Sequence, residues 1–126
     1  MINNYKIAII GSGTAGLAVA AYLKKDGHKP EIFERFEEPK PLGAGLLLQP
    51  TGLACLAALD LDMKAIEYGA PIHNIYGQAA KNKVIFDISY RNLKPHYFGL
   101  GIHRGTLFSI LYDEVLRLKI PVHTGY

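Results

Sequence analysis

A glycine-rich turn near the N-terminus constrains the fold of this 126-residue chain more than any other feature. The apolar stretch 5–10 runs directly into a tight run of small residues: Gly11, Ser12, Gly13, Thr14, Ala15 and Gly16. Apolar side chains then recur at helical spacing over residues 14–26, and Gly27 is placed to end that helix. A second apolar strand follows at 30–34. This order predicts a right-handed β-α-β unit with two parallel strands.

The spacing of the three glycines predicts a binding site for an adenine dinucleotide. Gly11 permits the tight turn, Gly13 lets the backbone approach a pyrophosphate, and Gly16 lets the helix pack closely on the strand. The start of the helix adds unpaired N–H groups and a partial positive charge, which favour phosphates. The alternative is a glycine-rich turn that serves packing alone, but the flanking strands and helix favour the dinucleotide.

The second strand ends on an acidic residue, Glu34, which is placed to accept hydrogen bonds from the hydroxyls of an adenosine ribose. Its charge would repel a 2′-phosphate, so FAD or NAD fits better than NADP. Arg35 weakens this inference, because an arginine at that position could meet such a phosphate.

The remaining pattern predicts an α/β fold: a Rossmann-like, dinucleotide-binding type of domain with a parallel sheet plus a small β-hairpin insertion. The two strands of the hairpin are expected at 72–76 and 83–88, followed by an irregular loop at 89–98. The other predicted elements are a charged, proline-containing loop at 35–42, a helix at 50–59, a helical turn at 63–68, a helix at 104–118 and a third parallel strand from 120. Because that strand begins so late, the fold is expected to be truncated and its sheet edge unpaired. Such an edge is expected to pair with another chain, as in a homo-oligomer, or with a missing segment.

Composition excludes several other classes of function. The net charge is +3 and the basic residues are scattered, so no nucleic-acid partner is expected. No apolar run is long enough to span a membrane, and no signal peptide is evident, so a cytoplasmic location is predicted. The one cysteine, Cys55, is expected to be buried and inert. The histidines show no metal-ligand spacing, so no metal site is predicted.

The chain resembles the flavoprotein aromatic hydroxylases, the single-component FAD-dependent monooxygenases typified by p-hydroxybenzoate hydroxylase. Three stretches match the motifs of that family in order and spacing: residues 9–18 with 33–35, residues 43–50 with the leucines that follow, and residues 102–107 with Leu111. The first stretch is common to many flavoproteins, whereas the second and third make the resemblance more specific.

The resemblance implies a role for each matched residue. The turn from Gly11 to Gly16 would hold the FAD pyrophosphate, Glu34 the adenosine ribose, and Arg35 would lie beside the adenine–ribose end. Gly45 and Leu46 would lie near the flavin side of the cofactor. Arg104 would reach the ribityl or phosphate region, where a guanidinium adds a charge-assisted hydrogen bond. No catalytic residue is assigned, because in this family the flavin carries the oxygen chemistry and the protein orients it.

The implied activity is an oxidoreductase that hydroxylates a small organic substrate, of aromatic type, with NADH or NADPH and O2. Members of the family are considerably longer, and their later Asp-Gly and Gly-Asp-Ala motifs lie outside this sequence. Residues 1–126 are therefore predicted to be the N-terminal part of an FAD-binding domain, with the hairpin insertion at about 70–100 starting a substrate domain. The isolated chain is expected to be inactive as an enzyme. A non-oxygenating FAD oxidoreductase, of reductase or halogenase type, and a catalytically inactive nucleotide-binding fragment stay open as alternatives.

Overall fold

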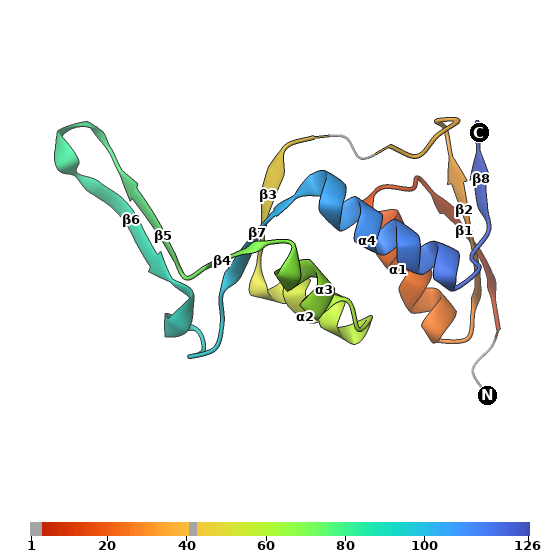
Figure 1. Ribbon diagram of the computed structural model, residues 1–126, viewed down its shortest axis with the longest axis horizontal. Coiled ribbons are helices and arrows are strands. Elements are labelled where there is room, and N and C mark those ends of the chain that lie inside the picture. Colours follow the sequence, from red (N-terminus) through yellow and green to blue (C-terminus); the bar gives the residue numbers. More distant parts are fainter. Residues whose placement is uncertain (1–3, 41–42) are drawn as a thin grey trace. The chain divides into compact units, whose positions relative to one another are not determined.

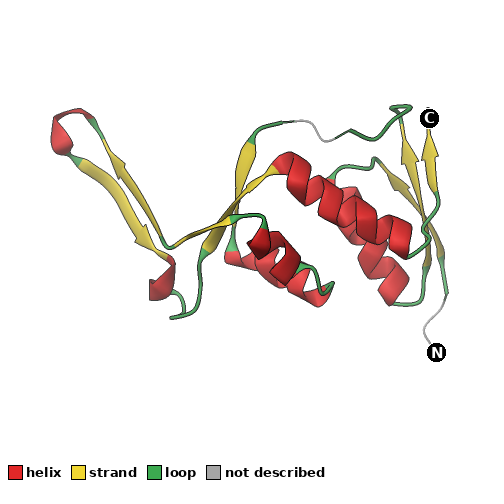
Figure 2. Cartoon of the chain, viewed as in Figure 1, coloured by secondary structure: helices red, strands yellow, loops and turns green. Residues whose placement is uncertain are grey.

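The chain divides into two compact units, which are described separately here. Unit 1 comprises residues 1–44 and 104–126, and unit 2 comprises residues 45–103. The computed structural model describes residues 4–40 and 43–126. Figure 1 labels the helices and strands in chain order, and Figure 2 distinguishes helices, strands and loops by colour.

Unit 1 is a parallel sheet with helices. Its strands lie in the order β1-β2-β8, and both pairings are parallel. The elements are β1 (Lys6–Ile10), α1 (Thr14–Lys25), β2 (Lys29–Glu34), α4 (Arg104–Arg117) and β8 (Val122–Thr124). The predicted β-α-β unit and the third parallel strand are thus confirmed, and Gly27 ends the first helical segment with a φ of 87°.

The core of unit 1 forms where α1 and α4 pack on each other and α1 packs on β2. Leu17, Ala20 and Ala21 share one face of α1 at i, i+3 and i+4 spacing, and all three are fully buried. Ile32 at the centre of β2 is also fully buried. Burying a large aliphatic side chain contributes about 1.5–3 kcal/mol, so this small set fixes which face of the sheet the helices cover.

The near-continuous apolar run at 5–10 predicts a strand covered on both faces, but β1 is covered on one face only within the part of unit 1 that the structure describes. In β1, Ile7 and Ile9 are half-buried, whereas Ala8 and Ile10 are exposed, Ile10 to 84%. The helices of unit 1 lie on the face that Ile9 shares with Gly16, and no described helix of this unit lies on the other (Figure 1).

Unit 2 consists of antiparallel strands and short helices. One sheet has the order β3-β7-β4, and β5 pairs with β6 in a separate hairpin. The elements are β3 (Gly45–Leu48), α2 (Pro50–Ala58), α3 (Asp62–Glu67), β4 (Ala70–Ile72), β5 (Asn74–Gln78), β6 (Val84–Ser89) and β7 (Gly99–His103), with single 3-10 turns at Ala80–Asn82 and Tyr90–Asn92. The predicted hairpin is confirmed, and α2 begins at Pro50 as expected.

The sequence pattern does not predict the sheet formed by β3, β4 and β7. In β7 the reason is that two residues are glycine, which is rare in strand interiors. The packing explains one of them. A Cβ on Gly99 would lie 2.9 Å from both Leu47 Cδ1 and the Tyr90 hydroxyl oxygen, so a larger residue would collide with neighbours on both sides. Close packing at the middle of the sheet therefore overrides strand propensity here.

The expectation that Cys55 is buried is also wrong. Cys55 is exposed on α2, while the next residue, Leu56, points inward and is 4% exposed. The helix is apolar nearly all round, so composition could not tell which side faces the core. No helix among residues 4–40 and 43–126 is long and apolar enough to cross a membrane.

Candidate nucleotide-binding site

The glycine turn of unit 1 has the geometry that its spacing predicts. Gly11 has a φ of 97°, a conformation that glycine adopts without strain, and its N–H donates to the Phe33 carbonyl over 2.8 Å. A Cβ on Gly16 would overlap the Gly11 carbonyl oxygen, so α1 can approach β1 this closely only with glycine at that position. Around Gly13, in contrast, no described atom lies within 4 Å of where a Cβ would be.

The start of α1 leaves backbone donors available. Gly13 is the N-cap residue, no described side chain caps the helix, and the first turn holds no acidic residue. The first intrahelical hydrogen bond runs from the Leu17 N–H to the Gly13 carbonyl. The N–H groups before it have no partner within the helix, and they sit at the positive end of the helix dipole. An anion is therefore favoured at this end of α1.

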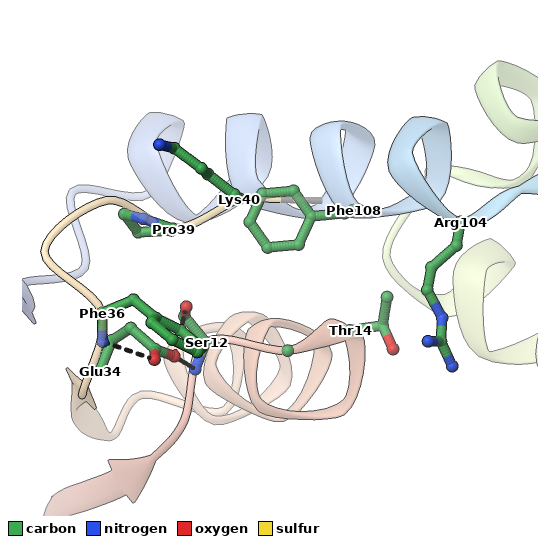
Figure 3. Close-up of a pocket in the computed structure, with 9 residues that line it drawn as sticks. Ser12, Thr14, Glu34, Phe36, Pro39, Lys40, Arg104 and Phe108 are labelled. Atoms are coloured by element: carbon green, nitrogen blue, oxygen red, sulfur yellow. Dashed lines mark hydrogen bonds between the residues drawn. The ribbon is translucent and has the colours of Figure 1, made fainter. Parts of the chain in front are cut away.

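Glu34 closes β2 with its carboxylate held from two sides. Oε2 accepts hydrogen bonds from the Ser12 N–H at 2.7 Å and the Ser12 hydroxyl at 2.8 Å, and Oε1 accepts one from the Phe36 N–H at 3.0 Å (Figure 3). These donors, the Ser12 N–H most of all, lower the pKa of Glu34 to about 2 although its burial opposes the shift. Glu34 is thus a fixed, ionised acceptor that is only 7% exposed.

A cavity of about 330 Å³ joins the start of α1 to this carboxylate. Figure 3 shows Glu34, Ser12 and Phe36 toward one end, and Thr14 with Arg104 toward the other. Its lining residues all belong to unit 1: Ser12, Gly13, Thr14, Glu34, Phe36, Pro39, Lys40, Arg104 and Phe108. The cavity therefore combines an acidic end, backbone donors and the cationic Arg104, while the Lys40 ammonium is paired with Glu38 at 2.8 Å. This combination suits an elongated ligand with both hydroxyl and anionic groups.

Arg104 reaches the cavity from the first residue of α4. Its backbone N–H donates to the Ala44 carbonyl over 3.2 Å. A Cβ on Gly43 would lie 2.9 Å from Arg104 Cδ and Nη1, so the bare Gly43 backbone, at φ 114°, leaves room for the side chain. A cation at a helix start opposes the dipole, which makes an anionic ligand a better explanation of this arginine than helix stability.

Most of the predicted site residues meet in unit 1. The cavity is lined by Ser12, Gly13, Thr14, Glu34 and Arg104 among them, whereas Ala15 and Gly16 belong to the first turn of α1 and Gly11 lines the same hollow as Arg35. Arg35 points instead to a neighbouring hollow of about 510 Å³, which Ile10 and Tyr126 also line, and its guanidinium lies 4.7 Å from the Phe36 ring centroid. The role of each residue toward the cofactor stays a prediction.

Gly45 and Leu46 belong to unit 2, where they pair with His103 and Ile102 across β3 and β7. They line an open, mainly apolar hollow together with residues of β4, β5 and β7. Their predicted approach to the flavin side of the cofactor stays a prediction.

Four residues of the cavity wall were not predicted: Phe36, Pro39, Lys40 and Phe108. One of them had a usable signal, because Phe108 lies four residues after Arg104 and so falls on the same helix face. The other three lie in the loop that follows β2, whose path no periodic pattern describes. Among the residues described, no group of three or more His, Cys, Asp or Glu side chains is arranged to hold a metal ion.

Comparisons with known proteins agree with this geometry. Residues 4–118 match the family model described as an FAD binding domain. The FAD-dependent monooxygenase atnA of Arthrinium sp is 32% identical over 128 residues, which cover 98% of this chain and 17% of that protein. The FAD-dependent urate hydroxylase of Klebsiella oxytoca is 38% identical over 68 residues, which cover 54% of this chain and 18% of that protein.

Solved structures share the fold at lower sequence identity. The tetrameric form of 2-methyl-3-hydroxypyridine-5-carboxylic acid oxygenase superposes with a TM-score of 0.83 at 20% identity, over 98% of this chain and 32% of that one. PqsL of Pseudomonas aeruginosa, a probable FAD-dependent monooxygenase, gives a TM-score of 0.82 at 18% identity, over 98% of this chain and 33% of that one. This chain thus spans 17% of the first curated relative and about a third of these structures. It belongs to the FAD binding domain family and represents the N-terminal portion of that domain as FAD-dependent monooxygenases carry it.

Proposed function

We propose that unit 1 binds the ADP portion of FAD, with the pyrophosphate at the start of α1 and the adenosine ribose at Glu34. The observation that carries this proposal is the cavity that joins an uncapped helix start to an ionised, nearly buried carboxylate. A pyrophosphate needs N–H donors and positive potential, whereas a ribose diol needs an acceptor. Both requirements are met within one cavity.

The described residues fit this part of the cofactor. The open space around Gly13 allows a phosphate to approach the backbone, and Gly16 brings the helix close to β1. Arg104 lines the same cavity, and its positive charge offsets part of the negative charge of the two phosphates. The negative Glu34 favours a free ribose diol over a 2′-phosphorylated one.

For the whole protein, we propose an FAD-dependent monooxygenase that hydroxylates a small aromatic substrate with NADH or NADPH and O2. Bound FAD supplies the redox chemistry, and this chain's residues bind and orient its adenosine end. The two curated relatives described above are named as a monooxygenase and a urate hydroxylase, which favours oxygenation over a reductase or halogenase activity. A homo-oligomer that pairs through the sheet edge of unit 1, in the cytoplasm, also belongs to this proposal.

Calorimetric titration of the purified 126-residue chain tests the binding proposal. FAD and ADP are expected to bind, whereas FMN, which lacks the adenosine half, is expected to bind far more weakly. Binding of FMN without ADP would contradict the proposed orientation. Binding of none of the three would contradict the binding proposal and favour a truncated remnant that no longer binds a nucleotide. The isolated chain is expected to show no substrate-dependent oxidation of NADH or NADPH, and measurable turnover would disprove that expectation.

A further inference from the structure

We propose that Ser12 is a positioning residue that holds Glu34 for recognition of an unmodified ribose diol, rather than a contact for the pyrophosphate. This inference rests on the proposed function of the cavity. It concerns how unit 1 distinguishes an adenosine ribose with free 2′ and 3′ hydroxyls from modified forms.

Both hydrogen-bond donors of Ser12 are directed at one atom. Its N–H lies 2.7 Å and its hydroxyl oxygen 2.8 Å from Glu34 Oε2. An ionised carboxylate can only accept, so the hydroxyl must donate its single hydrogen to Glu34. That hydrogen is then unavailable to a phosphate. The N–H groups that follow Ser12, at the start of α1, are left for the anion.

The carboxylate is held on its second oxygen as well. The Phe36 N–H donates to Oε1 over 3.0 Å. Ser12, which precedes α1, and Phe36, which follows β2, therefore fix the plane of the carboxylate together. Ser12 is 3% exposed and Glu34 7% exposed, which leaves little room for another rotamer. Ser12 occupies both lone pairs of Oε2, so Oε1 is the oxygen that retains a lone pair for a ligand hydroxyl. A group fixed in advance loses less conformational entropy on binding than a mobile one.

The charge of Glu34 determines which form of the ribose is favoured. The same donors keep its pKa near 2, so the carboxylate is ionised at neutral pH. Hydroxyls of a free diol can donate to it, whereas a 2′-phosphate would bring a second negative charge beside it. The cationic groups that share the cavity, Arg104 and Lys40, lie in α4 and in the loop after β2, and Arg35 follows Glu34 directly. Arginine and lysine side chains do not change charge at acidic pH, whereas Glu38, which pairs with Lys40 at 2.8 Å, and the terminal phosphate of ADP do. The contribution of Glu34 is therefore taken from the difference in acid limit between the wild type and its variants.

The experiment compares the affinity of the 126-residue chain for ADP and for 2′-deoxy-ADP, which lacks one of the two hydroxyls. The wild-type chain is expected to prefer ADP. Ser12→Ala is expected to bind ADP about tenfold more weakly, which corresponds to about 1.4 kcal/mol of binding free energy. The ratio of its affinity for ADP to its affinity for 2′-deoxy-ADP is expected to be smaller than in the wild type. The matched control is Ser109→Ala, the same change at an exposed position of α4, which should leave both affinities unchanged.

Two further readouts separate positioning from a general loss of structure. In a Glu34→Gln background, Ser12→Ala should lower the affinity for ADP much less than it does in the wild type, because the two residues act as one unit. The acid limit of ADP binding should also move to higher pH in Ser12→Ala, since one of the donors that lower the Glu34 pKa is gone. If Ser12→Ala does not fold, Ser12→Cys serves for all three measurements, because a thiol of similar size is a weaker donor.

The outcomes distinguish the role proposed for Ser12 from the proposed binding of the ADP portion of FAD. If the wild-type chain binds neither FAD nor ADP, the proposed function fails. If it binds ADP, but Ser12→Ala keeps the wild-type affinity, preference and acid limit, the proposed function stands and the role of Ser12 is overturned. Equal losses in the wild-type and Glu34→Gln backgrounds would likewise overturn it.

Discussion

The two units differ in how their strands bury apolar side chains. In β2 of unit 1, burial alternates along the strand, and Ile32 and Glu34 point to the covered face. In β6 of unit 2, four large apolar side chains are between 42% and 64% exposed: Val84, Ile85, Phe86 and Ile88. The comparison teaches that unit 1 builds a covered sheet face and a polar cavity from its own residues, whereas the hairpin of unit 2 leaves apolar surface uncovered by the described residues of that unit. Large exposed apolar patches of this kind mark contact surfaces.

The largest expected effect concerns the turn of unit 1. Gly16→Ala places a Cβ on the Gly11 carbonyl oxygen, a backbone atom that cannot move away. We expect a loss of about 3 kcal/mol or more in the free energy of unfolding, together with loss of ADP binding. Urea denaturation followed by circular dichroism measures the first, and calorimetry the second.

Gly13→Ala is the matched control, because open space surrounds a Cβ there. This variant should fold with nearly wild-type stability but bind ADP more weakly, since the new methyl group lies where the phosphate is proposed to approach. If Gly16→Ala is as stable as Gly13→Ala, the close contact between α1 and β1 is not what determines this turn.

The second-largest effect is expected in the buried part of unit 2. Leu100 in β7 is fully buried, so Leu100→Ala should leave a cavity and cost about 2–5 kcal/mol. Hydrogen exchange should show faster amide exchange in β3 and β4, which pair with β7, than in the hairpin of β5 and β6. Uniformly faster exchange throughout unit 2 would show instead that the hairpin shares this core.

A smaller effect links the charge of Glu34 to the stability of unit 1. The pKa of Glu34 is about 2 in the folded chain against an ordinary value of 4.5. Because the folded pKa is depressed, the stabilisation is fully present above pH 4.5 and is lost as the pH falls from there toward 2. Glu34→Gln should therefore be less stable than the wild type at neutral pH, and the gap should narrow over that window. If the difference in free energy of unfolding between the two proteins does not change with pH, the charge of Glu34 does not stabilise unit 1.

The smallest effect is expected in the hairpin. Ile85 is 64% exposed, so Ile85→Ser should change the free energy of unfolding by no more than about 0.5 kcal/mol. The same change removes apolar surface and should lower self-association, which light scattering at increasing protein concentration measures. A loss comparable with that of Leu100→Ala would mean that this side chain is buried in the folded protein.

Sequence reasoning gave the β-α-β unit, the helix after Gly11–Gly16, the hairpin and the last parallel strand, because each has a local period or a local turn signal. It missed the sheet of β3, β4 and β7, in which Gly99 serves packing against Leu47 and Tyr90 rather than strand propensity. It placed Ser12 and Glu34 in one site from motif spacing alone. It could not show that they bond to each other across 22 positions, or that Phe36 and Lys40 fold back over the cavity, because no local pattern encodes these contacts.

The discontinuity of unit 1 has a consequence for folding order on the ribosome. Arg104 and Phe108 line the cavity with Gly13 and Glu34, yet residues 45–103 are synthesised between the two segments. The β1–β2 pair and α1 can form early, whereas β8 can pair with β2 only after unit 2 has emerged. Contacts so distant in sequence slow folding, because a long loop must close before they form. The nascent chain therefore exposes the N–H groups at the start of α1 before the arginine that faces them exists.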